Sequence, residues 1–254
     1  MTTRPNVLVI GGYDQSGGAG VLADVKTMEA HGVYAYAVIT GLTYQNERTI
    51  RRVQWLPEED IREQIELCWQ STPFEWAKIG VGWSLPMIEK IILYLRELDA
   101  GIRIVLDPVI RSSSGHDFWQ GAGMEDFESV ARLCYLVTPN WDEIGWLYPG
   151  QDVMECCRKL TAAAPCAIYL KGGHHPSAPG RDYLWREGSV RVLEPIPGSG
   201  PFYPKHGSGC VMASSLTADL ALGYGLMEAA VRSKWYIEKF LGSNKSLLGW
   251  HSPL

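Results

Sequence analysis

Residues 6–25, NVLVIGGYDQSGGAGVLADV, combine a short apolar run, a glycine-rich segment and the start of a second apolar pattern. The run at 6–12 is rich in β-branched residues and ends in two glycines, which is typical of a buried strand followed by a loop. Residues 16–32 place Val21, Val25 and Met28 on one side of a helix, and Gly32 marks its end. The stretch therefore predicts a strand, a loop and a helix.

The rest of the chain repeats this alternation. Further strands are expected at 34–40, 76–82, 103–109, 135–140 and 166–173, with a hairpin at 182–195 that turns at Glu187 and Gly188. Further helices are expected at 57–71, 84–101, 141–148, 152–164, 209–225 and 226–242. This order predicts an α/β protein with a mostly parallel central sheet flanked by helices on both faces. No linker or repeat divides the chain, so we expect a single domain over residues 1–254.

Composition narrows the class of protein. The net charge of −5 argues against nucleic acid or an anionic membrane as the main partner. The six cysteines are irregularly spaced and contain no C-x-x-C pair, which favours a reducing compartment over a disulfide framework. Neither a signal-peptide pattern nor an apolar run of about 18 residues is present. We therefore expect a cytoplasmic protein without a membrane or nucleic-acid partner.

Polar or glycine-rich segments follow six of the predicted strands. They are GGYDQSGGAG (11–20), GLTYQN (41–46), GVGW (80–83), DPVIRSSSG (107–115), TPNWDE (138–143) and KGGHH (171–175). Ligands of open α/β sheets bind beyond the carboxyl ends of the strands, so we expect these segments to be loops around one site. The glycines at 17–20 either cradle an anion or allow close packing. P-loop and Rossmann spacings are absent, which disfavours those two nucleotide-binding classes.

Acidic, amide and basic side chains recur in these segments. Asn140 and Glu143 lie three residues apart at a strand-to-helix junction, where an ordinary capping box would have the same pattern. Together with Asp107, they could instead hold Mg²⁺ through oxygen atoms and water. Lys171 could contact a nucleotide phosphate, or it could simply reach solvent at the end of a strand.

The segment HGSGC (206–210) is predicted to begin a helix. Unpaired amides and the helix dipole make such a position favourable for negative charge, and Gly207 and Gly209 let a ligand approach the backbone. Cys210 is expected there to have a lowered pKa, in the range of about 3.5 to 7.5, and to accept a proton. Two alternatives are a hydrolase nucleophile, with His206, His174 or His175 as its base, and an inert core cysteine.

The order of these segments resembles one known family. The matching pieces are VLVIGGYDQSGGAGVLADVKTMEAHGVYAYAVITGLTYQN, KIGV, VLDPVI, TPNWDEIGWL, YLKGGHH and HGSGCVMASSLTADLALG, which together span about residues 6 to 225. They resemble the hydroxymethylpyrimidine/phosphomethylpyrimidine kinases of thiamine biosynthesis, which have the ribokinase-like fold and are similar to bacterial pyridoxine kinases. Each piece alone is weak evidence, but their joint order is specific.

The resemblance implies a role for individual residues. Those that would bind the substrate pyrimidine are Gly12, Asp24, Gln45, Val81 and Val109. Those on the nucleotide and Mg²⁺ side are Asp107, Asn140, Glu143 and Lys171, with Asp107 and Glu143 as the metal carboxylates. Those that would form the anion hole and accept the proton are Gly207, Ser208, Gly209 and Cys210. With Cys210 in this role, the hydrolase interpretation loses most of its support.

Some positions depart from the family pattern. Val81 stands where a methionine is common, and no lysine follows Asp107-Pro108-Val109, where IRSSSGHDF occurs instead. Arg111 is a candidate source of the missing charge. Trp83 and Trp119 either line the pocket or serve packing. These changes bear on the substrate more than on the kinase assignment.

The resemblance implies ATP-dependent phosphorylation of 4-amino-5-hydroxymethyl-2-methylpyrimidine, of its monophosphate, or of both, with ATP and Mg²⁺ as cofactors. The alternatives are a pyridoxine or pyridoxal kinase of the same fold and a non-catalytic pyrimidine-binding protein. A homodimer is expected from the resemblance alone.

Overall fold

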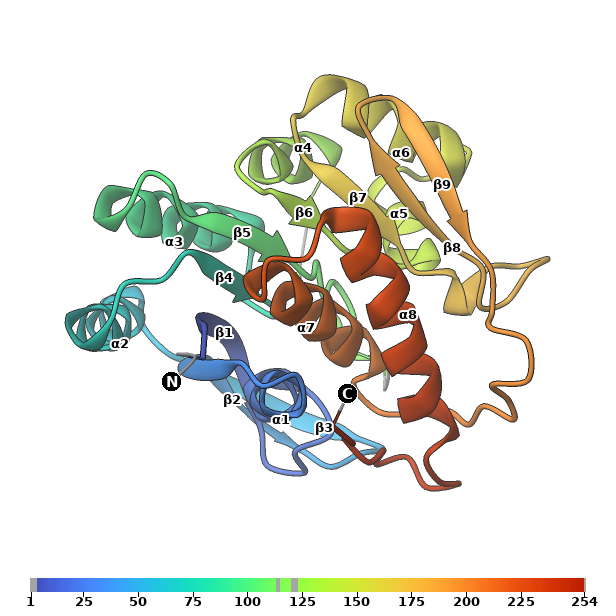
Figure 1. The fold of residues 1–254 in the computed structure, drawn as a ribbon. Coiled ribbons are helices and arrows are strands. Elements are labelled where there is room, and N and C mark those ends of the chain that lie inside the picture. Colours follow the sequence, from blue (N-terminus) through green and yellow to red (C-terminus); the bar gives the residue numbers. More distant parts are fainter. Residues whose placement is uncertain (1–3, 113–114, 120–122, 254) are drawn as a thin grey trace.

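Apolar runs and glycine stops along the chain produce one mixed sheet with helices on both faces (Figure 1). The computed structural model describes residues 4–112, 115–119 and 123–253. The strands in these residues are β1 (Asn6–Asp14), β2 (Tyr34–Gln45), β3 (Ile50–Trp55), β4 (Trp76–Ile79), β5 (Arg103–Leu106), β6 (Leu136–Val137), β7 (Ala167–Leu170), β8 (Asp182–Arg186) and β9 (Ser189–Leu193). The helices are α1 (Gly20–Ala30), α2 (Glu58–Ser71), α3 (Leu85–Leu98), α4 (Met124–Arg132), α5 (Trp141–Leu147), α6 (Val153–Ala163), α7 (Ser208–Ala221), α8 (Leu226–Gly242) and the 3₁₀ helix η1 (Gly172–His174).

The sheet of the described residues has nine strands in the order β3-β2-β1-β4-β5-β6-β7-β8-β9. Strands β2, β1, β4, β5, β6 and β7 are parallel to their neighbours within this set. Antiparallel pairing occurs at the two ends of this sheet, between β2 and the edge strand β3, between β7 and β8, and between β8 and the edge strand β9. The sheet thus confirms the predicted α/β class with a mostly parallel sheet, and the hairpin turns at Glu187 and Gly188 as expected.

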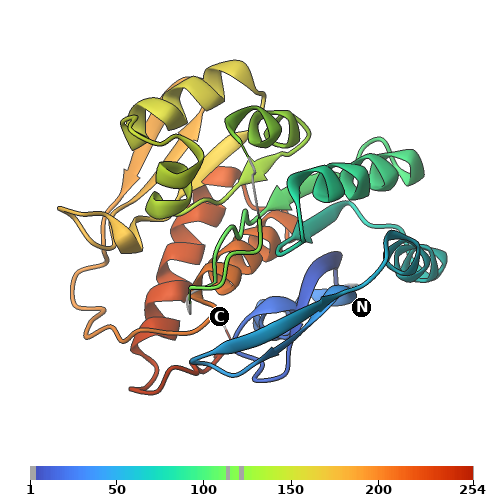
Figure 2. The same ribbon diagram turned by 180° about the vertical axis from the view of Figure 1, so that it is seen from behind.

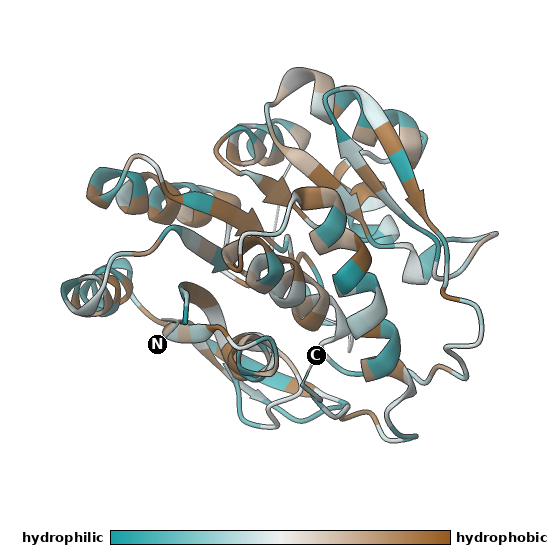
Figure 3. Ribbon diagram, viewed as in Figure 1, coloured by the Kyte–Doolittle hydropathy of each residue, from teal (hydrophilic) through white to brown (hydrophobic). Residues whose placement is uncertain are grey.

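Successive side chains of a strand point to opposite faces of the sheet, and they form two apolar layers, one on each face. In β1, Val7 and Val9 face the layer formed with α1, α7 and α8, whereas Leu8 and Ile10 face the layer formed with α2 to α6. Figure 2 shows the second group of helices from behind the sheet. Hydrophobic residues gather on the central strands, and the outer surfaces of α2 and α8 carry hydrophilic ones (Figure 3).

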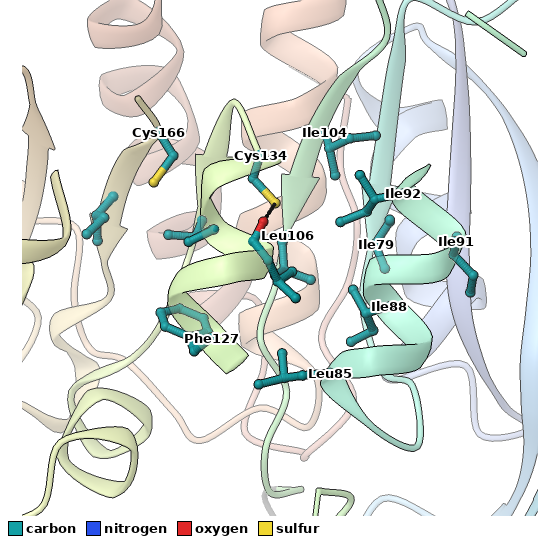
Figure 4. Packing of buried hydrophobic residues seen from close by; sticks show 14 of the residues in the cluster. Ile79, Leu85, Ile88, Ile91, Ile92, Ile104, Leu106, Phe127, Cys134 and Cys166 are labelled. Atoms are coloured by element: carbon teal, nitrogen blue, oxygen red, sulfur yellow. Dashed lines mark hydrogen bonds between the residues drawn. The ribbon is translucent and has the colours of Figure 1, made fainter. Parts of the chain in front are cut away.

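The layer behind the sheet contains closely packed aliphatic and aromatic side chains. Ile88 and Ile92 of α3 lie beside Ile79 of β4, and Phe127 of α4 lies near Leu106 of β5 (Figure 4). All five are at most 1% exposed, so each contributes about 1.5–3 kcal/mol by burial. The six cysteines are free thiols in the structure.

Three elements were not predicted from the sequence: strand β3, helix α4 and the 3₁₀ helix η1, which lies at the end of the predicted strand 166–173. Strand β2 continues through GLTYQ to Gln45 instead of ending at residue 40, and it pairs with the unpredicted strand β3. A Cβ at Gly41 would meet the Trp55 ring at 2.7 Å, so the glycine is a close approach between strands and not a loop signal. Helix α4 is short, with Phe127, Val130 and Ala131 on its buried face.

Several predicted boundaries are also wrong by a few residues. Strands β4, β5 and β6 end at Ile79, Leu106 and Val137, which leaves Gly80–Gly82, Asp107–Val109 and Thr138–Asn140 as irregular segments at one sheet edge. Helix α1 begins at Gly20 and not at residue 16. Among the described residues, no helix has both the length and the apolar character needed to cross a membrane.

Candidate active site

The amino end of α7 is fixed by a glycine contact. Gly207 precedes the helix with a φ of 75°, a left-handed conformation that strains other residues. A Cβ at this position would clash with the Gly18 carbonyl oxygen and lie 2.7 Å from the Cα of Ala19. Only glycine therefore allows this helix end to pack against the loop after β1. The predicted helix start at HGSGC is confirmed.

Two pockets meet at this helix end. The α8 pocket is lined by Asn140, Lys171, Ser208, Gly209, Phe202 and Met212, among others. The β1 pocket is lined by Gly12, Asp24, Gln45, Val81, Val109, Gly207 and Cys210, among others. Adjacent residues of one helix turn thus face different pockets. An anion at the end of α7 would lie between them, close to unpaired amides and the positive end of the dipole.

Lys171 contacts two carboxylates beside Gly209. Its Nζ lies 2.6 Å from Asp107 Oδ1 and 4.0 Å from Glu143 Oε2, and the lysine side chain is 13% exposed. Burial would lower the pKa of Lys171, but Asp107 and Glu143 outweigh it and raise the pKa. A Cβ at Gly209 would be 3.2 Å from the ammonium and 3.9 Å from Asp107 Oδ2. The lysine therefore does not simply reach solvent, and its charge faces the helix end.

Asn140 and Glu143 form the capping box that the sequence left as an alternative. Glu143 N donates to Asn140 Oδ1 at 2.9 Å, and Asn140 N donates to Glu143 Oε2 at 2.7 Å. Burial raises the pKa of Glu143, although Lys171 opposes this effect. Capping fixes the Glu143 carboxylate next to Lys171, so the structural and functional interpretations are compatible.

The glycine-rich loop after β1 is organised by Asp14. Its carboxylate accepts from Ser16 N and Ala19 N at 2.9 Å each and contacts His206 Nε2 at 2.9 Å. A Cβ at Gly20 would clash with the carbonyl oxygen of Gly12. Because Asp14 already occupies two of the loop's amides, this geometry favours close packing over the anion-cradle alternative.

A buried ion pair lies at the base of the β1 pocket. Lys78 Nζ contacts both carboxylate oxygens of Asp24 at 2.9 Å, and Ser214 Oγ of α7 donates to Asp24 Oδ1 at 2.7 Å. The three side chains are at most 1% exposed. Asp24 is therefore beside the predicted ring-binding residues, but its oxygens already have protein partners.

The expected low pKa of Cys210 is wrong for the ligand-free protein. Burial raises the pKa of the thiol to about 11; Asp107 and Asp24 add to this effect, while the Lys78 ammonium opposes it. The helix end therefore does not offset desolvation in this site. His174 and His175 do not line the β1 pocket: His174 contacts Asp142 Oδ2 at 2.7 Å and His175 contacts the Tyr183 hydroxyl at 3.1 Å. These two histidines are not placed to activate Cys210.

The segment after Asp107 forms a flap over the β1 pocket. Phe118 N donates to Ile110 O at 2.9 Å, and Ser112 and Phe118 line the pocket. Arg111 pairs with Asp117 and lies 4.5 Å from the Trp146 ring, so its charge is directed to the outside of the flap. Ser113 and Ser114 of this stretch lie outside the described residues.

Trp119 and Trp83, which the sequence left as pocket or packing residues, both pack outside the β1 pocket. Trp119 is 5% exposed and donates through Nε1 to Gly82 O at 3.1 Å. Trp83 lies 6.0 Å from Trp55, in an outer aromatic depression and not in the β1 pocket.

Sequence reasoning missed several residues of the site. Lys78 was read only as part of a strand, although a lysine inside an apolar run is itself a signal. Asp14 is the last residue of β1, and its role depends on contact with His206, which is distant in sequence. Thr43 and Phe118 line the β1 pocket from segments whose strand and flap structure gave no clear pattern.

Comparisons with known proteins identify the family to which the chain is similar. The family model described as phosphomethylpyrimidine kinase matches residues 14–254. A hydroxymethylpyrimidine/phosphomethylpyrimidine kinase from Aquifex aeolicus is 31% identical over 248 residues, covering 94% of this chain and 95% of the relative. A crystal structure of phosphomethylpyrimidine kinase from Clostridium difficile has a TM-score of 0.78 at 30% identity and covers 93% of this chain and 99% of that chain.

A pyridoxal kinase from Bacillus subtilis, solved as an ADP complex, has a TM-score of 0.81 at 24% identity. It covers 98% of this chain and 97% of that chain. At this identity the similarity concerns the fold alone. Together with the Clostridium difficile structure, it confirms the predicted ribokinase-like fold.

The raised pKa of Cys210 predicts slow alkylation of the ligand-free protein. With a pKa of about 11, only about one thiol in ten thousand is a thiolate at pH 7, and the thiolate is the reactive form. Iodoacetamide labelling of the Cys210 peptide, followed by mass spectrometry, should accelerate about tenfold per pH unit between pH 7 and 10. A rate that is already constant above pH 7 would instead indicate the low pKa expected from the helix end.

Proposed function

The chain belongs to the phosphomethylpyrimidine kinase family, and from this premise we propose that it transfers the γ-phosphoryl group of ATP to 4-amino-5-hydroxymethyl-2-methylpyrimidine, to its monophosphate, or to both, in thiamine biosynthesis. The family makes the chain a kinase. The choice of residues for each step is part of the proposal.

One observation carries this proposal: the α8 and β1 pockets meet at the amino end of α7. Ser208 and Gly209 line the first pocket, whereas Gly207 and Cys210 line the second. A kinase needs a donor and an acceptor on opposite sides of the transferring group, with stabilisation of negative charge between them. Backbone amides at the helix end supply that stabilisation in this arrangement.

ATP is assigned to the α8 pocket. Its lining includes the apolar side chains of Phe202, Met212, Ile237 and Leu241, which suit a base, and the ammonium of Lys171, which suits phosphates. Asn140 and Lys171 border the pocket next to Ser208 and Gly209. The phosphate chain would then extend from the apolar part towards the helix end.

Mg²⁺ is assigned to Asp107 and Glu143. No three His, Cys, Asp or Glu side chains of the described residues converge as a metal site. Two carboxylates nevertheless suit Mg²⁺, which usually binds one or two of them and takes its remaining ligands from water and phosphates. When bound, the ion would neutralise phosphate charge. Lys171 holds Asp107 in position through the 2.6 Å ion pair.

The pyrimidine is assigned to the β1 pocket. Gln45 offers both a donor and an acceptor to an aminopyrimidine edge, and Gly12 leaves space for a flat ring. Val81 and Val109 would provide apolar contacts on the same pocket wall. Asp24 would not contact the ring directly, because Lys78 and Ser214 already occupy its oxygens; it would act by holding Lys78 in place.

Cys210 is the proposed proton acceptor for the substrate hydroxyl. It lines the pyrimidine pocket next to Gly207, at the point where the phosphoryl group would arrive. Its high pKa in the ligand-free protein means that the thiol must lose its proton to water after the site is loaded and before the hydroxyl proton is transferred. We also propose a cytoplasmic homodimer of single-domain subunits, which size-exclusion chromatography with light scattering would check.

The proposed substrate predicts a specific activity and a specific loss. The purified protein should phosphorylate the hydroxymethylpyrimidine with ATP, and Gln45→Ala should raise KM by the equivalent of about 1–3 kcal/mol because polar ring atoms lose their partners. Gln54→Ala on the outward-facing edge strand is the matched control and should leave KM unchanged. Much faster turnover of pyridoxal than of the pyrimidine would favour the pyridoxal kinase alternative, and pyrimidine binding without turnover would favour a binding protein.

The assignment of Mg²⁺ to Asp107 and Glu143 predicts that variants of these residues need more Mg²⁺ for activity. Glu143→Gln keeps a side chain able to complete the capping box but removes its charge, so the Mg²⁺ concentration for half-maximal rate should rise several-fold and kcat should fall. Asp152→Asn, which alters the cap of α6, is the control and should not change the Mg²⁺ titration. Unchanged titrations for both Glu143→Gln and Asp107→Asn would leave the capping role as the better explanation.

Removal of the Cys210 thiol should slow the chemical step and spare binding. A positioned base contributes roughly 10²- to 10⁴-fold in rate, while the anion hole consists of backbone amides that remain in Cys210→Ala. Single-turnover phosphoryl transfer should therefore slow by about 10²-fold or more, with the Kd values for ATP and pyrimidine nearly unchanged. Near wild-type transfer would reduce Cys210 to a packing residue.

A further inference from the structure

Lys78 lies where the fold requires an apolar residue. It belongs to β4, a strand buried along its whole length, and its side chain is 1% exposed. Alternation places Ala77 and Ile79 in the layer behind the sheet, and it places Trp76 and Lys78 in the layer with α1 and α7. An ammonium group thus lies between the sheet and helices α1 and α7, at the base of the β1 pocket.

The partners of Lys78 connect it to the reacting end of α7. Ser214 donates to Asp24 Oδ1 at 2.7 Å, and Asp24 holds the ammonium with two contacts of 2.9 Å. Ser214 and Cys210 are four residues apart in α7 and therefore share one face of the helix. Lys78 accordingly lies beside Cys210, in the pocket proposed for the pyrimidine.

The ion pair is a costly way to fill this space. Burying an ammonium and a carboxylate requires desolvation of both, and an apolar pair of the same volume is often at least as stable. Burial alone would lower the pKa of Lys78, but Asp24, together with Cys210 and Asp107, raises it, so the group keeps its charge. An ammonium has three N–H donors, and the two oxygens of Asp24 account for two of them. Because Lys78 also lines the β1 pocket, we infer that the third donor faces a ligand bound there.

We propose that Lys78 is a catalytic residue whose ammonium group donates a hydrogen bond to the substrate hydroxyl oxygen and stabilises the charge that develops there. In this step the hydroxyl O–H bond breaks and its proton passes to Cys210, which has already lost its own thiol proton to water and reacts as the thiolate. An O–P bond forms to the γ-phosphorus as the bond to the β–γ bridging oxygen breaks, and ADP leaves with that electron pair. Lys78 keeps its proton throughout, and Asp24 and Ser214 are positioning residues. This inference rests on the proposed function.

The test compares Lys78→Met with the wild-type enzyme in single-turnover transfer and in ligand binding. Loss of one donor to a developing oxyanion typically lowers kcat by about 10²- to 10³-fold, and we expect that range here. The Kd of 4-amino-2,5-dimethylpyrimidine, which lacks the hydroxyl group, should stay within about twofold of the wild-type value, as should the Kd of ATP. The analogue separates contact with the hydroxyl from contact with the ring.

Two further variants separate chemistry from folding. Asp24→Asn/Lys78→Met removes both charges and avoids an unpaired buried carboxylate, so it answers the question if the single variant does not fold. Arg232→Met is the matched control, because Arg232 Nε contacts the fully buried Asp219 at 2.9 Å outside the two pockets. It should lower the melting temperature and leave kcat unchanged.

The outcomes are distinct. A kcat within about threefold of wild type in the Lys78 variants would overturn the inference and leave the kinase assignment intact. A weaker Kd for the dehydroxylated analogue, equal in factor to the loss of kcat/KM, would overturn it as well, because Lys78 would then bind the ring. Absence of ATP-dependent turnover in the wild-type protein would overturn the proposed function and this inference with it.

Discussion

The close contact between Gly207 and the Gly18–Ala19 backbone determines where α7 begins. A side chain on Gly207 would force the helix end away from the loop after β1, because it would meet a carbonyl oxygen and a Cα atom that belong to fixed backbone. The same contact closes the β1 pocket on one side and leaves Ser208 and Gly209 facing the α8 pocket on the other. The positive end of the helix is therefore a shared wall of two pockets, which is the arrangement that transfer between two ligands requires.

The charges around this wall occur as matched sets. Lys171 is held by Asp107 and Glu143 on the side of the α8 pocket, and Lys78 is held by Asp24 on the side of the β1 pocket. Breaking a buried pair by removing one partner typically costs about 3–5 kcal/mol, because the remaining charge is uncompensated. Each acid thus makes it possible to keep a cation next to the helix end before any ligand binds. The β1 pocket is preorganised in its charge as well as in its shape.

Local patterns predicted most of the fold, and they failed where long-range pairing decides the structure. The apolar runs and glycine stops indicated most central strands, because a parallel strand that is buried on both faces has a nearly continuous apolar sequence. Strand β3 was missed because its residues alternate weakly and depend on β2, and β2 itself was cut short at Gly41. Residues of the glycine-rich and strand-end segments line the two pockets, because the strand topology brings those segments to one edge of the sheet. The high pKa of Cys210 was not predictable, since it results from burial, with a smaller contribution from the Asp107 and Asp24 carboxylates, which are distant from Cys210 in sequence.

The flap after Asp107 bears on which groups supply positive charge to the β1 pocket. The family resemblance implies a lysine in this segment, and Arg111 was the candidate to replace it. Arg111 instead pairs with Asp117 on the flap and lies over Trp146, so it stabilises the outer side of the flap. Among the described residues that line the β1 pocket, Lys78 is the only lysine or arginine. His206 also lines the pocket but contacts Asp14 at 2.9 Å, so the end of α7 and Lys78 are the other sources of positive charge near an acceptor oxygen there. This ties the departure in the flap to the buried ion pair of β4.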